Sequence, residues 1–237
     1  MKHPILIQGA MDSELNWLIQ AADLRSVSQT GNFRFWEGTL AGVPVVICKT
    51  GIGEINAAAV TALAIGRYAP AAILNQGTAG AHCASLGVGD VIIGERVCYL
   101  SPFSMEKSRN EDPLNPWKSQ AFCSPEGETV SYRANDALLR TAKSAYEKEP
   151  RIIYGCIGSG DLWTREPADL QELNRLHGTL CEDMETAAVY LTANHLGVPA
   201  LAIRVISNNE QTGAPFNEQS ALRAQELTVK LLPFLCT

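Results

Sequence analysis

Three carboxylates gather where a strand-like segment gives way to an apolar helical pattern. Glu182, Asp183 and Glu185 stand at this junction, and the helical pattern continues to about residue 195. A helix N-terminus favours negative charge and exposes free backbone N–H groups, so these acids could act only as helix caps. Carboxylates are also the groups that accept protons or hydrogen bonds from a ligand. The stretch therefore predicts either a capped helix or part of a site.

Two further polar clusters follow apolar runs elsewhere in the chain. Residues 11–14 read MDSE and residues 207–210 read SNNE. In an open α/β sheet, ligands bind in the crevice beyond the carboxyl ends of the strands. We therefore expect the three clusters to meet at one site.

The composition limits the class of protein. The chain has 237 residues, of which 46% are hydrophobic and 19% charged, and its net charge is −6. A nucleic-acid partner is not expected, because such a protein would carry a basic stripe. The 7 cysteines are scattered without a CxxC pair, which fits a reducing compartment. The apolar run at residues 5–7 is too short to cross a membrane. We expect a cytoplasmic protein without a membrane partner.

The elements that must position these clusters alternate along the chain. Apolar runs near residues 4–8, 43–49, 71–74, 89–100, 151–157 and 200–206 predict strands, and helical patterns fall between most of them. Alternating strands and helices predict an α/β fold with a mostly parallel mixed sheet. Neither a repeat nor a linker divides residues 1–237, so one domain is expected. Residues 101–128 lack periodicity, and a loop of this length is usually functional or interfacial.

Six short motifs together resemble a known family. They are residues 9–14 (GAMDSE), 50–58 (TGIGEINAA), 75–80 (NQGTAG), 159–161 (SGD), 183–185 (DME) and 204–207 (RVIS). Their order is similar to that in methylthioadenosine/S-adenosylhomocysteine nucleosidases of the nucleoside phosphorylase superfamily. The resemblance implies a three-layer α/β/α sandwich with a twisted mixed sheet, usually as a homodimer. It also implies hydrolysis of the N-glycosidic bond of a purine nucleoside without a metal or cofactor.

The resemblance assigns roles by position. Glu14 matches the base that activates water, Glu185 the carboxylate that binds the ribose hydroxyls, and Asn208 stands where the family has its general acid. Without the resemblance, Glu14 would be an exposed helix acid and Trp163 a core residue. Asp183 and Glu182 are interpreted as capping acids. The expected substrate contacts are Thr78, Gly80, Trp163, Met184, Arg204, Ser207, Phe103 and Phe216, and for Arg204 a structural ion pair is an equal alternative.

Hydrolysis and phosphorolysis differ in their need for a phosphate site. Phosphorylases of the superfamily carry arginines in the first glycine loop and before the Gly-Thr turn, because arginine is the usual phosphate ligand. Residues 9–11 and 75–77 contain neither Arg nor Lys, and Glu14 would repel phosphate. A nucleosidase is therefore favoured, and a phosphate-dependent purine nucleoside phosphorylase is the alternative.

Asn208 departs from the family, which has Asp at this position. An amide cannot give up a proton, and general acid catalysis contributes about 10²–10⁴-fold. An amide can donate to a 6-oxo group, so the substrate could be a 6-oxopurine nucleoside instead of an adenine nucleoside. Asn209 or Glu210 could replace the acid, or the chain could be a catalytically weakened nucleoside-binding protein.

The segment at residues 101–117 also departs from the family. It is longer, and Phe103 loosely matches an aromatic that reaches the neighbouring subunit's 5′ pocket in the family's dimers. We expect this loop near a homodimer interface, and the 5′ substituent of the substrate stays open.

Overall fold

The computed structural model describes residues 3–101, 103–104, 120–121 and 130–235. Most of the strands join one sheet, and β7 and β8 form a separate short pair. The strands are β1 (Ile5–Gly9), β2 (Asp23–Thr30), β3 (Phe33–Leu40), β4 (Val43–Lys49), β5 (Ala72–Ala81), β6 (Val91–Tyr99), β7 (Phe103–Ser104), β8 (Gln120–Ala121), β9 (Ser131–Arg133), β10 (Ile152–Ser159), β11 (Thr179–Asp183) and β12 (Ala200–Asn208).

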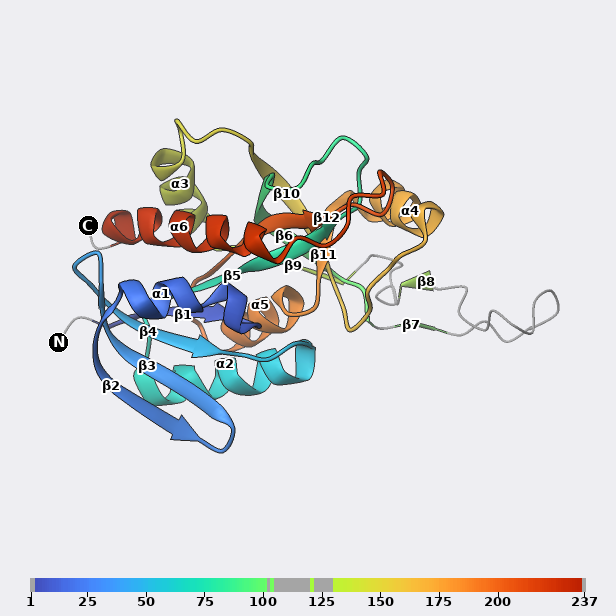
Figure 1. Ribbon diagram of the computed structural model, residues 1–237. Coiled ribbons are helices and arrows are strands. Elements are labelled where there is room, and N and C mark those ends of the chain that lie inside the picture. Colours follow the sequence, from blue (N-terminus) through green and yellow to red (C-terminus); the bar gives the residue numbers. More distant parts are fainter. Residues whose placement is uncertain (1–2, 102, 105–119, 122–129, 236–237) are drawn as a thin grey trace.

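Helices cover both faces of the large sheet (Figure 1). On one face α6 packs against α1 and α3, and on the other α2 packs against α5. The helices are α1 (Asn16–Ala21), α2 (Glu54–Tyr68), α3 (Asp136–Ala145), α4 (Pro167–His177), α5 (Thr186–His195) and α6 (Ala221–Leu231), with 3₁₀ helices η1 (Asp12–Glu14), η2 (Glu218–Ser220) and η3 (Leu232–Leu235). Within the described residues, none of these helices is both long and apolar enough to span a membrane.

The sheet has the order β11-β10-β6-β12-β5-β1-β4-β3-β2, and β9 pairs with β6. A further antiparallel pairing joins β11 to β5, so β5, β12, β6, β10 and β11 form a closed ring of strands. The expected mixed sheet is confirmed, but the expectation of a mostly parallel one is wrong. In the large sheet, as far as the structure describes it, the antiparallel pairs are as numerous as the parallel ones. The antiparallel pairs are β2–β3, β3–β4, β6–β9, β6–β12 and β5–β11. The parallel pairs are β1–β4, β1–β5, β10–β11, β6–β10 and β5–β12. The sheet therefore closes on itself through β11 and β5, and the three-layer sandwich stays a prediction.

The core consists of apolar runs on strands with both faces covered. Val91, Ile92 and Ile93 in β6 are fully buried, and all nine residues of β12 are buried. Continuous apolar runs are typical of strands that helices cover on both sides. β2 differs, because its residues are mostly exposed and polar. It forms the edge of the sheet, where burial imposes no strict pattern.

Candidate active site

The three polar clusters meet around one cavity of about 260 Å³. It lies at the carboxyl ends of β1, β5, β11 and β12, where an α/β sheet places its ligands. Its walls combine four acids with small and aromatic side chains. The lining residues are Ala10, Met11, Glu14, Ile52, Thr78, Ala79, Gly80, Leu162, Trp163, Glu182, Asp183, Met184, Glu185, Ser207, Asn208 and Phe216.

Glu14 is a buried carboxylate held in one orientation. It ends η1, and its Oε2 accepts hydrogen bonds from the N–H groups of Ala10 at 2.8 Å and Met11 at 3.1 Å. Its Oε1 accepts from Thr78 N at 2.8 Å and from Thr78 Oγ1 at 3.0 Å. Gly77 permits this approach, because a Cβ there would lie 2.6 Å from Oε1. Glu14 is therefore no exposed helix acid but a fixed proton acceptor on the cavity wall.

Asp183 and Arg204 form a buried ion pair behind the cavity. Arg204 Nε donates to Asp183 Oδ2 at 2.5 Å, and Asp183 Oδ1 accepts from the N–H of Thr186 at 3.1 Å. Burial alone would raise the pKa of Asp183, but the Arg204 charge and the Thr186 hydrogen bonds outweigh it and lower that pKa. Asp183 thus caps α5 and also borders the cavity.

Glu185 precedes α5 and faces the same cavity. Its Oε1 accepts from Gly53 N at 3.0 Å, and its Oε2 lies 3.9 Å from Arg204 Nη2. Burial, followed by the negative charge of Asp183, raises its pKa above the usual glutamate value, although the Arg204 charge opposes this. Such a carboxylate can accept hydrogen bonds from ligand hydroxyls once it is ionised.

Asn208 and Ser207 both line the cavity at the end of β12. Successive strand residues normally face opposite sides, but the pairing of β12 with β5 is irregular between Ile206 and Asn208. The Ser207 hydroxyl lies 3.0 Å from Asn208 Oδ1 and 3.1 Å from the carbonyl oxygen of Ala79. Within the described chain, the Asn208 NH₂ group makes no hydrogen bond, which leaves it available to a ligand.

Asn209 and Glu210 are turned away from the cavity. Asn209 is fully buried, donates to the carbonyls of Cys83 and Leu86, and accepts from Gln211 N at 3.0 Å. Glu210 pairs with Arg165 at 3.5 Å and does not line the cavity. The structure therefore gives neither side chain the position that a replacement general acid needs.

Two aromatic rings stand at the mouth of the cavity. Trp163 and Phe216 are 52% and 44% exposed, and their ring centroids are 6.3 Å apart at an angle of 61°. Partly exposed aromatic rings beside a cavity can stack on a flat ligand. Trp163 is thus not a core residue. Met184 adds apolar surface to the same cavity.

Two expected substrate contacts are placed differently. Arg204 does not line the cavity, because its guanidinium is buried beneath it on Asp183, so the ion-pair alternative describes it. The side chain of Phe103 lies outside the described residues, as does most of the segment at 101–117. The other predicted contacts, Thr78, Gly80, Trp163, Met184, Ser207 and Phe216, border the cavity together with Glu14, Glu185 and Asn208.

Sequence reasoning missed the role of Glu182, which was taken for a capping acid. Its Oε1 accepts from Thr164 N at 2.6 Å, its Oε2 lies 3.2 Å from His82 Nε2, and it borders the cavity. His82 Nδ1 lies 2.8 Å from Thr179 Oγ1. His82 is separated from Glu182 by 100 residues in sequence, so only the pairing of β11 with β5 reveals this contact.

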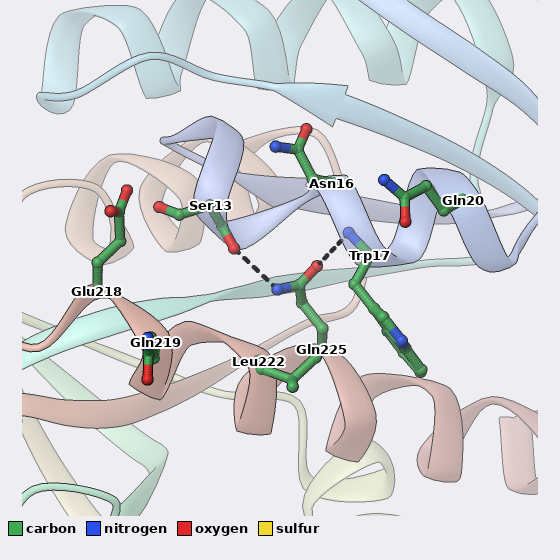
Figure 2. Close-up of a pocket in the computed structure, with 8 residues that line it drawn as sticks. All are labelled: Ser13, Asn16, Trp17, Gln20, Glu218, Gln219, Leu222 and Gln225. Carbon is green, nitrogen blue, oxygen red and sulfur yellow. Dashed lines mark hydrogen bonds between the residues drawn. The ribbon is translucent and has the colours of Figure 1, made fainter.

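A second hollow, of about 310 Å³, lies between α1, η2 and α6 (Figure 2). Most of its lining is polar and uncharged, and Gln225 lies at its base. The Gln225 amide binds backbone, with Nε2 donating to Ser13 O at 2.9 Å and Oε1 accepting from Trp17 N at 3.1 Å. This hollow supports η1, the segment that carries Glu14, and holds no group poised for chemistry.

Comparison with known proteins agrees with this fold and site. A model of the phosphorylase superfamily matches residues 4–233. The chain belongs to the phosphorylase superfamily, and the family resemblance expected from its motifs is confirmed.

Particular relatives are 5′-methylthioadenosine/S-adenosylhomocysteine nucleosidases. The protein of that name from Anoxybacillus flavithermus is 29% identical over 231 residues, which cover 94% of this chain and 95% of the relative. The nucleosidase of Neisseria meningitidis, solved with methylthio-immucillin-A, matches with a TM-score of 0.81 at 25% identity, over 97% of this chain and 98% of that one. Futalosine hydrolase of Helicobacter pylori shares the fold, with a TM-score of 0.81 at 19% identity over 98% and 97% of the two chains.

Proposed function

We propose that this protein is a purine nucleosidase, which hydrolyses the N-glycosidic bond between a purine and its ribose. The observation that carries the proposal is the fixed carboxylate of Glu14 in a cavity lined by four acids. The 5′-methylthioadenosine/S-adenosylhomocysteine nucleosidases that the chain resembles support the same reaction.

Glu14 activates the attacking water in this proposal. Three backbone N–H groups fix its carboxylate before the substrate binds. The fourth donor is the Thr78 hydroxyl, which can rotate and leave one lone-pair position for the water. It takes a proton from water while the water oxygen bonds to the anomeric carbon. The C–N bond breaks, and its electron pair leaves with the purine, which takes up a proton from solvent. Ribose and free base are the products.

Glu185 stabilises the sugar as positive charge develops on it. The transition state of glycoside cleavage is oxocarbenium-like. A carboxylate that accepts hydrogen bonds from the ribose hydroxyls orients the sugar and favours that charge. Met184 forms the apolar floor beneath the sugar, and Thr78 and Gly80 border it. Trp163 and Phe216 enclose the base, and Ser207 orients Asn208 toward it.

The charge of the cavity favours water over phosphate. Among the described residues, no Lys or Arg lines the cavity, while Glu14, Glu182, Asp183 and Glu185 do. A phosphate dianion would meet four carboxylates without a cation to bind it. Phosphorolysis is therefore disfavoured by electrostatics.

The reaction is tested by product analysis with and without phosphate. We expect purine release at the same rate in phosphate-free buffer and in phosphate buffer, with free pentose as the only sugar product. Glu14→Gln should lower kcat at least 100-fold, in line with the size of general base catalysis. Phosphate dependence with pentose 1-phosphate as product would show a phosphorylase. Tight nucleoside binding without turnover would show a binding protein.

We also propose that the protein acts as a cytoplasmic homodimer, with residues 101–117 near the interface. Ile52 and Ile55, at the start of α2, are 53% and 81% exposed, and Ile52 also borders the cavity. Apolar surface of this kind favours a protein partner. The five described cysteines are free, which suits a reducing compartment. Sedimentation analysis at assay concentration tests the dimer, and Ile55→Glu should shift it toward monomer.

A further inference from the structure

Glu182 is a carboxylate of the cavity for which the proposed reaction has no use. It is 7% exposed, and each oxygen already has one partner, Thr164 N at 2.6 Å and His82 Nε2 at 3.2 Å. A carboxylate offers about four lone-pair positions, so two remain for a ligand. Since a carboxylate oxygen can only accept, His82 donates to Glu182 from Nε2, and its Nδ1 lies 2.8 Å from the Thr179 hydroxyl. Glu182 is thus a preoriented acceptor.

Glu182 and Asn208 flank the same residue of β5. Gly80 is the pairing partner of Glu182 on β11 and of Asn208 on β12. A Cβ on Gly80 would lie 3.4 Å from Asn208 Nδ2, so the amide passes close to the glycine. The Cα atoms of Glu182 and Asn208 are therefore about two strand spacings, roughly 10 Å, apart. A flat ligand edge fits between an acceptor on one side and an amide on the other.

The base end of the cavity lies at this edge. Trp163, the ring placed to stack on a base, immediately precedes Thr164, whose N–H binds Glu182. Glu182 and Trp163 line the same cavity, so a base stacked on Trp163 can present an edge to Glu182. Along one side of a purine, N1 and the substituent on C6 of the six-membered ring are followed by N7 of the five-membered ring.

The hydrogen-bonding pattern of this edge separates two classes of purine. In a 6-oxopurine N1 carries a proton and donates, and the oxygen on C6 accepts. In a 6-aminopurine N1 is an acceptor, and the amino group on C6 donates. An ionised Glu182 satisfies N1–H but repels the lone pair of an unprotonated N1. The free NH₂ group of Asn208 complements an oxygen on C6, whereas it meets another donor in a 6-amino group.

We infer that Glu182 is a specificity-determining residue that binds N1–H of the base, and that the substrate is a 6-oxopurine nucleoside, of hypoxanthine or guanine type. The inference rests on the proposed function for the cleavage but not for the recognition of the base. His82 is a positioning residue, which holds the Glu182 carboxylate toward the cavity. The Asn208 amide completes the pattern at the C6 oxygen, and no acid is needed at that position for binding.

The test compares nucleosides that differ only in the base. Inosine, 1-methylinosine and adenosine share one 5′ group, so the 5′ pocket does not affect the comparison. We expect kcat/KM for inosine to exceed that for adenosine at least tenfold, the size of one hydrogen bond to a charged group. The kcat/KM for 1-methylinosine, which lacks the N1 proton, should be lower than that for inosine by a similar factor. This arm uses the unaltered enzyme, so it does not depend on the folding of a variant.

Glu182→Gln supplies the second arm. The glutamine NH₂ group can donate to an unprotonated N1, and His82 can accept from the amide by moving its own proton to Nδ1. We expect the inosine-to-adenosine ratio to fall at least tenfold. Glu210→Gln is the matched control, because Glu210 neighbours the site without lining the cavity. Its ratio should stay at the value of the unaltered enzyme.

Binding of the free bases separates failure of the inference from failure of the proposed function. Calorimetry with hypoxanthine and adenine needs no turnover. One outcome is that no nucleoside is cleaved, but hypoxanthine binds at least tenfold more tightly than adenine and Glu182→Gln removes this preference. The proposed function is then wrong and the inference holds. A preference for adenine or adenosine, or a ratio unchanged in Glu182→Gln, overturns the inference while leaving a nucleosidase intact.

Discussion

Arg204 on β12 and Asp183 on β11 form a fully buried ion pair, in which Nε donates to Oδ2 at 2.5 Å. The guanidinium also donates to the carbonyl oxygen of Asn75 at 3.2 Å and lies near Glu185. The Arg204 cation thus compensates the buried charge of Asp183. Removing it would leave that charge uncompensated in a buried region.

Arg204→Met should therefore unfold the protein readily. Breaking a buried pair by removing one partner costs about 3–5 kcal/mol. Urea denaturation followed by circular dichroism measures the loss. Arg165→Met is the matched control, because Arg165 is exposed and pairs with Glu210 at the surface, where a pair contributes at most about 1 kcal/mol. Equal losses in the two variants would contradict the role of Arg204.

Gln225→Met should slow turnover without touching the cavity. The substitution leaves Ser13 O, Trp17 N and Leu18 N without the side-chain partner that holds η1 and Glu14 (Figure 2). We expect kcat to fall roughly tenfold, because small displacements of a catalytic group are costly, while KM changes little. Gln219→Met in the same hollow is the control, since its side chain is exposed. A rise in KM at constant kcat would argue against positioning of Glu14.

The raised pKa of Glu185 predicts an acid limb in the pH–rate profile. Only the ionised form accepts the hydroxyl hydrogen bonds, and burial and Asp183 shift ionisation to higher pH. The value of kcat/KM should therefore fall as the pH drops through this raised pKa, at a pH above that of an ordinary glutamate. Glu185→Gln should be slower at every pH and lack that limb. A limb that persists in this variant would assign the titration to another group.

Glu54 predicts a pH dependence of stability. Burial, followed by the charge of Asp161, raises the pKa of Glu54 from 4.5 to about 7, although the Ser101 hydroxyl donates to Oε2 at 2.7 Å. The folded state binds the Glu54 proton more tightly than the unfolded state does. The free energy of unfolding therefore decreases as the pH rises from about 4.5 to 7.

Glu54→Gln should remove that loss. The variant should be more stable than the natural protein at pH 8 by of order 1–3 kcal/mol, and the difference should vanish near pH 4. Urea denaturation at both pH values measures it. Glu226→Gln, an exposed acid on α6, is the control and should change stability by less than about 0.5 kcal/mol. A variant that is less stable at pH 8 would show that the Glu54 charge has a partner.

The sequence predicted the covered strands well because burial on both faces leaves an unbroken apolar run, as in Val91 to Ile93. It did not predict β2, an exposed edge strand, or the extension of β5 to Ala81. The apolar run that predicts this strand ends at residue 74, before the small and polar residues 75–80. In the structure they are strand residues whose small side chains make room for Glu14 and Asn208.

Candidate site residues were predicted where a local motif carried them, and missed where only the fold brings residues together. Glu14 and Glu185 lie in motifs that follow strand ends. The pairing of Glu182 with His82 depends on the antiparallel contact between β11 and β5, which no periodicity in either segment indicates. The sequence around Arg204 does not distinguish a residue that contacts the ligand from one that forms a buried ion pair.

The closed ring of strands gives the site a property that concerns its evolution. Gly80, Glu182 and Asn208 lie on β5, β11 and β12, and each of these strands is paired along both of its edges. Such a backbone cannot slide to fit a new ligand. A substitution of a group that faces the base can therefore leave the groups that face the sugar in place on the same rigid frame. A lineage could change the base it reads through two side chains and keep its hydrolytic chemistry unaltered.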